Sequence, residues 1–317
     1  MNSKENTVLI LGGNGRFGQH CTAAFAKKGW QVFAQTRSGK GLDADLAHFE
    51  RVTHCPVDLE NKDALTEIAL QCGVIVNGLN PPYGTWQTGA PKITDATIDL
   101  AKTSGATVIL PGNVYNFGAA MPELLDENTP HRPSNPWGKI RCAAEQAYRD
   151  AGVQTIVLRI GDFLQGKPSG NWFDTHMVSK LDKGVFIYPG DSSIPHANGY
   201  LPDAARTVVE LATIRETLGI FEDIPFEGHT LTGEDMRREI EKVMARPIKL
   251  KGIPWPILRI MSLFDKDMKG VLAMRYLWNT PHRLDDTKLK RLLPGYTPTP
   301  ACEMFEEMLA HQYPKTG

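Results

Sequence analysis

The sequence lacks a strong charge of either sign, and this lack excludes several classes of protein. Its 35 lysine and arginine residues stand against 36 aspartate and glutamate residues, so the formal net charge is −1. Without an excess of positive charge, electrostatics give no reason to expect nucleic acid or an anionic membrane as the main partner. No apolar run approaches the roughly 18 residues that a membrane-spanning helix needs.

Paired cysteines and clustered histidines are missing as well. The five cysteines are scattered and contain no Cys-x-x-Cys pair, which favours reduced thiols over a disulfide framework or a zinc site. The nine histidines form neither His-x-His nor His-Glu-x-x-His, so we expect no metal site. Residues 1–6 do not resemble a signal peptide. These features together predict a cytoplasmic protein.

Short apolar runs alternate with helix-length stretches through the first half of the chain. Five runs rich in β-branched residues are expected to be buried parallel strands: Thr7–Leu11, Gln31–Gln35, Val74–Asn77, Thr107–Leu110 and Thr155–Arg159. Four stretches are expected to be helices, each followed by a glycine that would stop it in the left-handed conformation: Phe17–Lys28, Lys62–Gln71, Pro91–Ser104 and Pro136–Ala151, with Gly29, Gly73, Gly105 and Gly152. The alternation predicts an α/β fold of Rossmann type, a doubly wound parallel sheet.

Past about residue 160 the pattern changes, because proline, glycine and aromatic residues become frequent. Further helices are expected at Asp203–Glu216 and Gly233–Ala245. We expect residues 1–165 to form a dinucleotide-binding domain, to which residues 200–218 return. Residues 166–199 and 219–317 are then expected to form a smaller, partly interleaved C-terminal cap that binds the substrate.

A glycine-rich loop follows the first expected strand and precedes the first expected helix. It reads Gly12, Gly13, Asn14, Gly15, Arg16, Phe17 and Gly18, with glycines at every third position. Such glycines allow a tight turn, close approach of the backbone to a pyrophosphate, and close packing of helix on strand. The helix that follows directs its N-terminal N–H groups at the phosphates. The motif in this setting predicts a dinucleotide site.

The end of the second expected strand bears on the choice of cofactor. An NAD site calls for an acidic residue there, but the chain has Arg37 and Ser38, with no carboxylate before Asp43. A guanidinium can bind a 2′-phosphate through two hydrogen bonds, and Arg16 is a second nearby cation. We therefore expect NADP(H) in preference to NAD; the alternative is that Arg37 is a solvated surface residue. Further cofactor contacts are expected from Asp58 and Leu59, which follow a strand between the second and third runs given above, and from Asn77 and Gly78 at the end of the strand Val74–Asn77.

With these motifs the sequence resembles the short-chain dehydrogenase/reductase superfamily, in its extended and atypical branch of NAD-dependent epimerase/dehydratase-like and NmrA-like proteins. The resemblance rests on the glycine loop, the Asp58–Leu59 pair, Val114–Tyr115, and the segments 200–205 and 286–300. It implies a Rossmann domain with a small cap and a monomer or homodimer.

The catalytic triad implied by the resemblance does not carry over to this chain. Members use a Ser or Thr after the fifth strand and a Tyr-x-x-x-Lys motif on the next helix, whereas this chain has Pro111 or Gly112 in the first place, with Trp137 and Arg141 in the others. Indole does not titrate in this range, and arginine stays charged, although Arg141 can still bind ribose or phosphate.

Two residues, or a bound water in their place, are candidates for the missing proton donor. Lys139 is suggested by the reductases among the NmrA-like relatives, in which a lysine near this helix start acts as the general acid; the alternative is a solvated surface lysine. Tyr115 is a phenol at the edge of the sheet where ligands bind; the alternative is a packed aromatic residue. Asp162 could act as a base, although a loop-capping role is the simpler interpretation.

The residues expected to line a pocket for a small carbonyl or sugar-like substrate are Tyr83, Trp86, Asn113, Asn116, Trp137, Phe163 and Trp172. Two functions remain open from the sequence. One is an NADP(H)-dependent oxidoreductase or epimerase-like enzyme with a replaced triad. The other is a non-catalytic NADP(H)-binding sensor or regulator of NmrA-like type.

Overall fold

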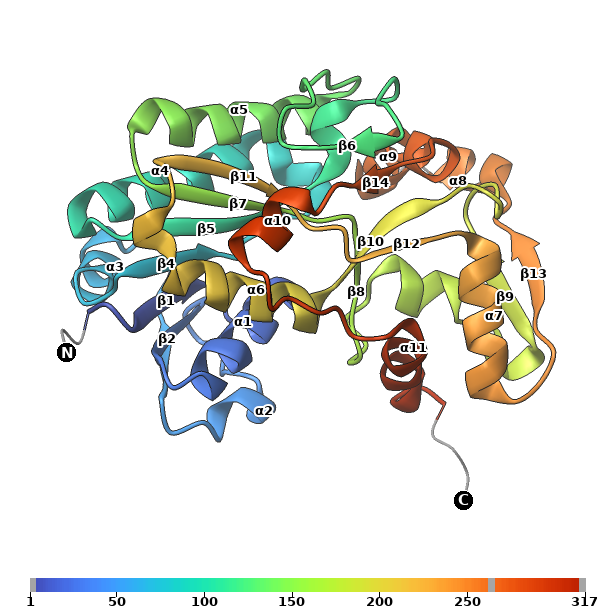
Figure 1. Cartoon of the computed structure of the whole chain (residues 1–317), viewed down its shortest axis with the longest axis horizontal. Helices are drawn as coiled ribbons and strands as arrows, with labels where there is room; N and C mark the ends of the chain where they lie inside the picture. The colour runs from blue at the N-terminus through green and yellow to red at the C-terminus, as the bar shows by residue number, and fades with distance from the viewer. Residues whose placement is uncertain (1–3, 262–265, 314–317) are drawn as a thin grey trace.

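The computed structural model describes residues 4–261 and 266–313, and its centre is one large twisted sheet (Figure 1). The sheet has seven parallel strands in the order β11-β7-β5-β4-β1-β2-β3. Their bounds are β1 Thr7–Leu11, β2 Gln31–Thr36, β3 Val52–Pro56, β4 Val74–Asn77, β5 Thr107–Gly112, β7 Thr155–Arg159 and β11 Phe221–Pro225. The predicted doubly wound α/β fold is therefore confirmed.

Helices cover both faces of the sheet because successive side chains of each buried strand point to opposite faces. Val8 and Ile10 of β1 pack in one core group with α1 (Arg16–Lys27) and α6 (Leu201–Thr213). Leu9 and Leu11 pack in a second group with α3 (Lys62–Ala69), α4 (Trp86–Ser104) and α5 (Pro136–Ala151). The short helices α2 (Ala44–Ala47) and α10 (Thr287–Leu292) lie against β3 and β11, respectively.

The cap is built from small sheets and helices beside one end of the large sheet (Figure 1). One sheet has the order β12-β10-β8, from His229–Leu231, His196–Tyr200 and Asp162–Leu164; two-stranded sheets pair β13 (Lys249–Gly252) with β9 (Val185–Tyr188), and β14 (Arg283–Leu284) with β6 (Leu124–Leu125). Its helices are α7 (Gly233–Met244), α8 (Trp255–Met261), α9 (Lys266–Ala273) and α11 (Ala301–Ala310). Short helical turns complete the chain: η1 Tyr83–Thr85, η2 Val114–Phe117, η3 Phe173–Met177, η4 Leu181–Lys183, η5 Arg215–Thr217 and η6 Arg275–Asn279.

Three expectations need correction. The helix predicted at Pro91–Ser104 begins five residues earlier, at Trp86, and carries Pro91 in its interior. Gly29, Gly105 and Gly152 have positive φ, but Gly73 does not; a Cβ there would lie 2.8 Å from the Lys4 carbonyl oxygen, so close packing explains this glycine. The segment that returns to the large sheet extends beyond residue 218, because β11 forms the edge strand of that sheet. The strand β8, which lies within residues 1–165, pairs instead in a sheet of the cap.

The helices described, those within 4–261 and 266–313, include none with the length and apolar character needed to cross a membrane.

Candidate active site

The glycine loop has the geometry that its spacing predicts. Gly12 has φ of +79°, in the left-handed region that favours glycine. A Cβ on Gly18 would lie 2.1 Å from the Gly12 carbonyl oxygen, so only glycine lets α1 start this close to β1. Gly15 is the N-cap of α1 and offers no side chain to its first N–H groups. These N–H groups can therefore receive a phosphate, and the loop fits a dinucleotide.

The side chain of Gln35 fixes this loop from the end of β2. Its Oε1 accepts a hydrogen bond from the Gly12 N–H at 2.9 Å, and its Nε2 donates to the Val57 carbonyl at 2.6 Å. Its neighbour Thr36 is buried, and its hydroxyl lies 2.8 Å from His54 Nε2. Because β2 ends in these neutral groups, it presents no carboxylate to a ribose. The sequence interpretation missed Gln35, since its partners lie on two other strand ends.

A cleft of about 1190 Å³ runs from the glycine loop, over the ends of β1, β4 and β5, to the cap. It brings together most of the residues predicted for the cofactor, namely Gly12, Asn14, Gly15, Arg16, Phe17, Arg37, Asn77, Gly78 and Arg141. It also includes Tyr115 and most of those predicted for the substrate, namely Tyr83, Trp86, Asn113, Phe163 and Trp172. This position, outside the carboxyl ends of parallel strands, is where open α/β sheets bind ligands.

Several residues predicted to contact the cofactor do not line this cleft. Gly13 and Gly18 lie beneath the loop backbone, where they permit its close packing. Asp58 and Ser38 are engaged with each other, because Asp58 Oδ1 accepts the Ser38 N–H at 2.9 Å. Leu59 packs against the second core group of the sheet. Within the described ranges, the end of β3 therefore adds no lining residue to the cleft.

Three further predicted residues also lie outside the cleft lining. Asn116 is fully buried, and its Nδ2 lies 3.4 Å from His131 Nδ1. Trp137 packs edge-on against Tyr83, with ring centroids 6.2 Å apart. Lys139 has an exposed side chain on α5. The structure therefore does not bring Lys139 to the other predicted site residues, whereas it does bring Tyr115.

Two phenols meet in the wall of the cleft. The hydroxyls of Tyr83 and Tyr115 are 2.8 Å apart, and the Asn113 side chain accepts the Tyr115 N–H at 3.0 Å. Burial raises the pKa of Tyr83, and it raises the pKa of Tyr115 well above its ordinary value, with a further contribution from Tyr83. Both hydroxyls therefore stay protonated at neutral pH and can donate a hydrogen bond or a proton.

Arg141 stands beside this pair, in the place where the resemblance implies a lysine. Its Nη2 donates to Asn80 Oδ1 at 3.0 Å, and its guanidinium lies over the Trp86 ring, 4.7 Å from the centroid. Its buried Nε has no hydrogen-bond partner among the described residues. Burial lowers the pKa of Arg141, but an arginine remains charged at neutral pH. Arg141 can thus hold a ribose or phosphate oxygen.

Asp162, the first residue of β8, is an acidic group that lines the cleft between the phenols and the cap. The Asp162 side chain is open to the cleft, and protein surrounds it on every other side. This enclosure within the protein raises the pKa of Asp162 to about 6. The carboxylate is therefore charged at neutral pH and becomes protonated in mildly acidic solution.

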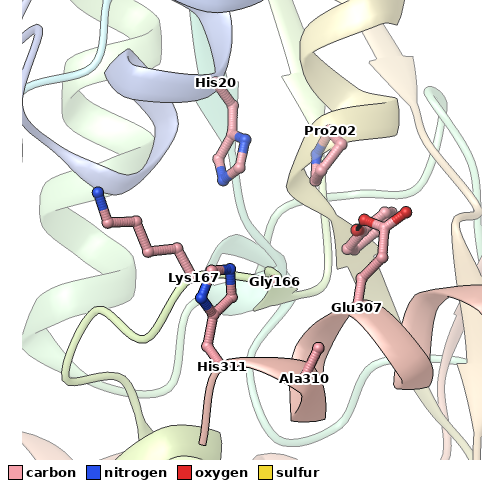
Figure 2. Close-up of a pocket in the computed structure, with 8 residues that line it drawn as sticks. His20, Gly166, Lys167, Pro202, Glu307, Ala310 and His311 are labelled. Atoms are coloured by element: carbon pink, nitrogen blue, oxygen red, sulfur yellow. Dashed lines mark hydrogen bonds between the residues drawn. The ribbon is translucent and has the colours of Figure 1, made fainter. Parts of the chain in front are cut away.

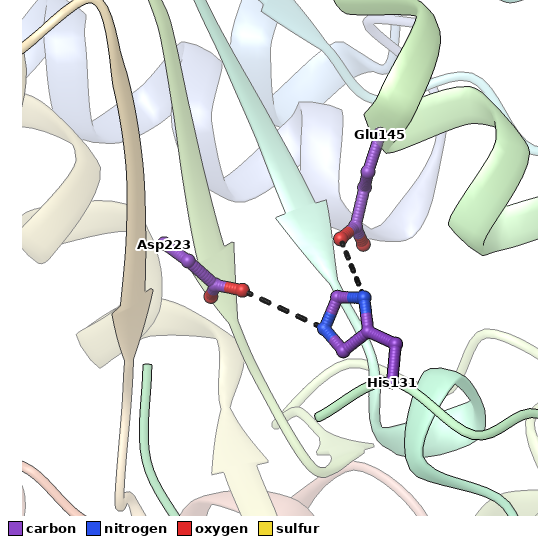
Figure 3. A group of neighbouring side chains, drawn as sticks. All are labelled: His131, Glu145 and Asp223. Atoms are coloured by element: carbon purple, nitrogen blue, oxygen red, sulfur yellow. Dashed lines mark ion pairs between the residues drawn. The ribbon is translucent and has the colours of Figure 1, made fainter. Parts of the chain in front are cut away.

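Figure 3 shows three members of a largely buried cluster of charged side chains, His131, Glu145 and Asp223. His131, Glu145 and Asp223 lie close enough to resemble a metal site. However, Arg159 Nη2 lies 2.8 Å from Glu145 Oε2 and 2.5 Å from Asp223 Oδ2, so a guanidinium already balances these carboxylates. Arg159 Nη1 also donates to the Asn113 carbonyl at 2.7 Å. Arg159 therefore fixes the end of β5, from which Tyr115 follows.

Residues 166–170, which we call the strap, connect the cap to the glycine loop. Arg16 Nε donates to Ser169 Oγ at 2.9 Å. Lys167 forms ion pairs with Asp43 at 3.0 Å and with Asp45 at 2.9 Å. The strap thus borders the cleft beside the glycine loop, where the phosphates of a dinucleotide would lie.

A second, smaller cavity of about 310 Å³ is lined by Gly166 and Lys167 of the strap (Figure 2). It is bounded by α1, α6 and α11, and its polar side chains are His20, Lys167, Tyr200, Glu307 and His311. The Tyr200 hydroxyl donates to Glu307, and Lys167 is already paired. Burial, followed by the charge of Lys27, lowers the pKa of His20 to about 4, so His20 is neutral. We assign no chemistry to this cavity.

Comparisons with known proteins agree with this architecture. The family model described as "NAD dependent epimerase/dehydratase family" matches residues 8–183. The fold is similar to that of a UDP-glucuronic acid 4-epimerase from Bacillus cereus in complex with UDP-glucuronic acid and NAD, at 16% identity and a TM-score of 0.75, covering 97% of this chain and 100% of that chain. It is also similar to WbmH from Bordetella bronchiseptica in complex with NAD+, at 13% identity and a TM-score of 0.73, covering 97% and 98%.

A third similar structure is the UDP-Glc/GlcNAc 4-epimerase from Campylobacter jejuni, at 15% identity and a TM-score of 0.69, covering 95% of this chain and 97% of that chain. No curated protein sequence matches the chain. At these identities the structures share a fold with this protein, and the family model, which spans more than half of the sequence, carries the assignment. The chain belongs to the NAD-dependent epimerase/dehydratase family.

Proposed function

We propose that this protein is an NADP(H)-dependent oxidoreductase that reduces a small carbonyl compound, with Tyr115 as the proton donor. The observation that carries the proposal is the hydroxyl pair of Tyr83 and Tyr115, 2.8 Å apart, in the cleft that begins at the glycine loop. When bound, a reduced nicotinamide supplies hydride to the carbonyl carbon. The Tyr115 hydroxyl then donates its proton to the carbonyl oxygen, the Tyr83 hydroxyl passes its own proton to Tyr115, and solvent water at the half-buried Tyr83 restores the proton there.

The protonation of the phenols favours reduction over epimerisation. An epimerase must first remove a proton from a substrate hydroxyl, and a phenol whose pKa is raised is a poor base at neutral pH. The same phenol is protonated at neutral pH, and it can give its proton to a carbonyl oxygen once hydride transfer turns that oxygen into an alkoxide, which is the stronger base. Arg141, beside the pair, would hold the cofactor ribose.

NADPH oxidation with a library of ketones and aldehydes tests the proposal. Tyr115→Phe keeps the ring and removes the proton, so we expect kcat to fall by about 10²–10⁴-fold while NADPH affinity is kept. Lys139→Ala is the matched control, and we expect it to leave kcat unchanged because its side chain is exposed. An equal loss in both variants would refute Tyr115 as the donor. Tight NADPH binding without turnover would favour the sensor or regulator instead.

The choice of NADP(H) rests on Arg37 and Lys40, which line the cleft at the end of β2. The carboxylate that lines the cleft beside them, Asp43, is paired with Lys167. We expect Arg37→Asp to weaken NADPH binding roughly ten- to hundredfold and to change NADH binding much less. Arg51→Asp, at an exposed arginine outside the cleft lining, is the control. Tighter binding of NADH than of NADPH by the unmodified protein, measured by calorimetry, would contradict this choice.

A further inference from the structure

The charged side chains of the cleft are unevenly distributed. Four of its cations, Arg16, Arg37, Lys40 and Lys167, lie at the glycine loop, the end of β2 and the strap. The fifth, Arg141, stands beside Tyr115 and is engaged with Asn80 and the Trp86 ring. One carboxylate, Asp43, lines this part of the cleft and pairs with Lys167. Positive charge therefore exceeds negative charge where the cofactor phosphates would bind.

The opposite part of the cleft is apolar. We call the cleft-lining residues from position 171 onward the cap wall. Among the described residues, the cap wall contains no lysine, arginine, aspartate or glutamate. Its apolar surface comes mainly from Trp172, Met177, Val271, Met274, Leu277 and Trp278.

The polar groups of the cap wall are neutral and mostly engaged with one another. The Tyr188 hydroxyl lies 2.8 Å from His196 Nδ1, and Asn198 Nδ2 donates to the His196 carbonyl at 2.9 Å. Burial, followed by the charge of His282, lowers the pKa of His196 to about 3, so this imidazole carries no charge at neutral pH. These groups can orient a neutral ligand, but they cannot balance an anion.

We infer that the substrate is an uncharged, largely apolar carbonyl compound with a ring, and that nucleotide-linked sugars are not substrates. This inference rests on the proposed function and narrows it. A phosphate or carboxylate against the cap wall would lose its hydration without gaining a cation, and it would also face the negative charge of Asp162. A neutral ring gains instead, because Trp172 and Trp278 meet edge to face at 5.4 Å and form a firm aromatic surface.

A matched pair of ketones tests this inference on the full chain with NADPH. One is a phenyl-substituted cyclohexanone, and the other is the same ketone with a carboxylate on the phenyl ring. We expect kcat/KM for the neutral ketone to exceed that for the carboxylate by at least about tenfold, the effect of about 1.4 kcal/mol. UDP-glucose should be neither converted nor able to raise the melting temperature of the NADPH complex.

A cation placed in the cap wall should weaken the preference for the neutral ketone. Met274→Lys adds a cation with little change in side-chain length, so we expect the preference for the neutral ketone to shrink at least about fivefold. Met274→Gln, which is polar but neutral, is the control and should weaken the binding of both ketones without favouring the carboxylate. Because Met274 is buried, Val271→Lys at a half-buried position provides a second variant if Met274→Lys does not fold.

The outcomes separate this inference from the proposed function. If neither ketone is reduced, the ketone and aldehyde library decides the proposed function, and binding of the two ketones to the NADPH complex, measured by calorimetry, decides the inference. Tighter binding of the neutral ketone would support it. Equal or tighter binding of the carboxylate, binding of neither ketone, or conversion of UDP-glucose would overturn it.

Discussion

The side chain of Asp162 changes its charge close to neutral pH, because burial raises the pKa of this carboxyl group to about 6. Its raised pKa of about 6 means that the folded protein binds this proton more tightly than the unfolded chain does. The stabilising effect is complete below the ordinary carboxyl pKa, near about pH 4, and is lost as the pH rises through about 6. Above that pH the charged, partly desolvated carboxylate costs stability.

Asp162→Asn should therefore stabilise the protein in a pH-dependent way. At pH 8 we expect a higher melting temperature than for the unmodified protein, because the variant holds no charge at this position. The difference should shrink between about pH 6 and pH 4, where the natural carboxyl becomes protonated in both states. Calorimetric melts across this range check the sign, and the low-pH measurement is the internal control. A difference that does not change with pH would contradict the assignment.

At the scale of elements, the contact between α1 and the glycine loop leaves no room for a side chain. We expect Gly18→Ala to cost roughly 1–3 kcal/mol of folding free energy, because its Cβ would lie 2.1 Å from a backbone oxygen that cannot move aside. It should also weaken NADPH binding. Gly41→Ala is the matched control, since no atom lies within 4 Å of its added Cβ, and it should change stability by less than about 0.5 kcal/mol. Urea unfolding of both variants makes the comparison.

The sequence predicts those elements whose signals are local. The strand at Thr7–Leu11, the helix at Pro136–Ala151 and the glycine loop depend on patterns within a few residues, and the structure agrees with them. The strand β11 has no such signal, because Phe221–Pro225 carries two carboxylates and has the pattern of a polar segment. One of them, Asp223, is paired with Arg159, 64 residues away. Only the folded sheet brings the two together.

The same reason explains what the sequence could say about the site. Tyr115 is predictable from its place after a strand, but its partner Tyr83 lies 32 residues away and reaches it only through the sheet order. Lys139 is suggested by a resemblance in spacing, and the direction of its side chain on α5 is not readable from that spacing. The cap wall comes from segments scattered over residues 171–278, which no local pattern connects.

The molecule as a whole has a core on each face of the large sheet and a further core within the cap. Met304, Phe305 and Met308 of α11 belong to the cap core, together with Phe173 and Met177. The last described helix thus supports the segment from which cap-wall residues reach the cleft.

Phe305→Ala should show this dependence. Removing a fully buried ring is expected to cost about 3–5 kcal/mol of folding free energy. Because the ring packs on Phe173, with centroids 6.2 Å apart, we also expect KM for the ketone to rise more than the Kd for NADPH. Cys302→Ala, on the exposed face of the same helix, is the control. A larger effect on NADPH than on the ketone would contradict this division between the cores.

The strap has a kinetic consequence. The strap contacts the glycine loop through the hydrogen bond between Arg16 and Ser169, and it contacts α2 through the ion pair between Lys167 and Asp45. Surface contacts of this kind contribute only about 0–1 kcal/mol each to the free energy that keeps a segment in place. Opening the strap is therefore inexpensive, and it becomes easier as salt screens the ion pairs. The rate at which a dinucleotide leaves the cleft should therefore rise with ionic strength.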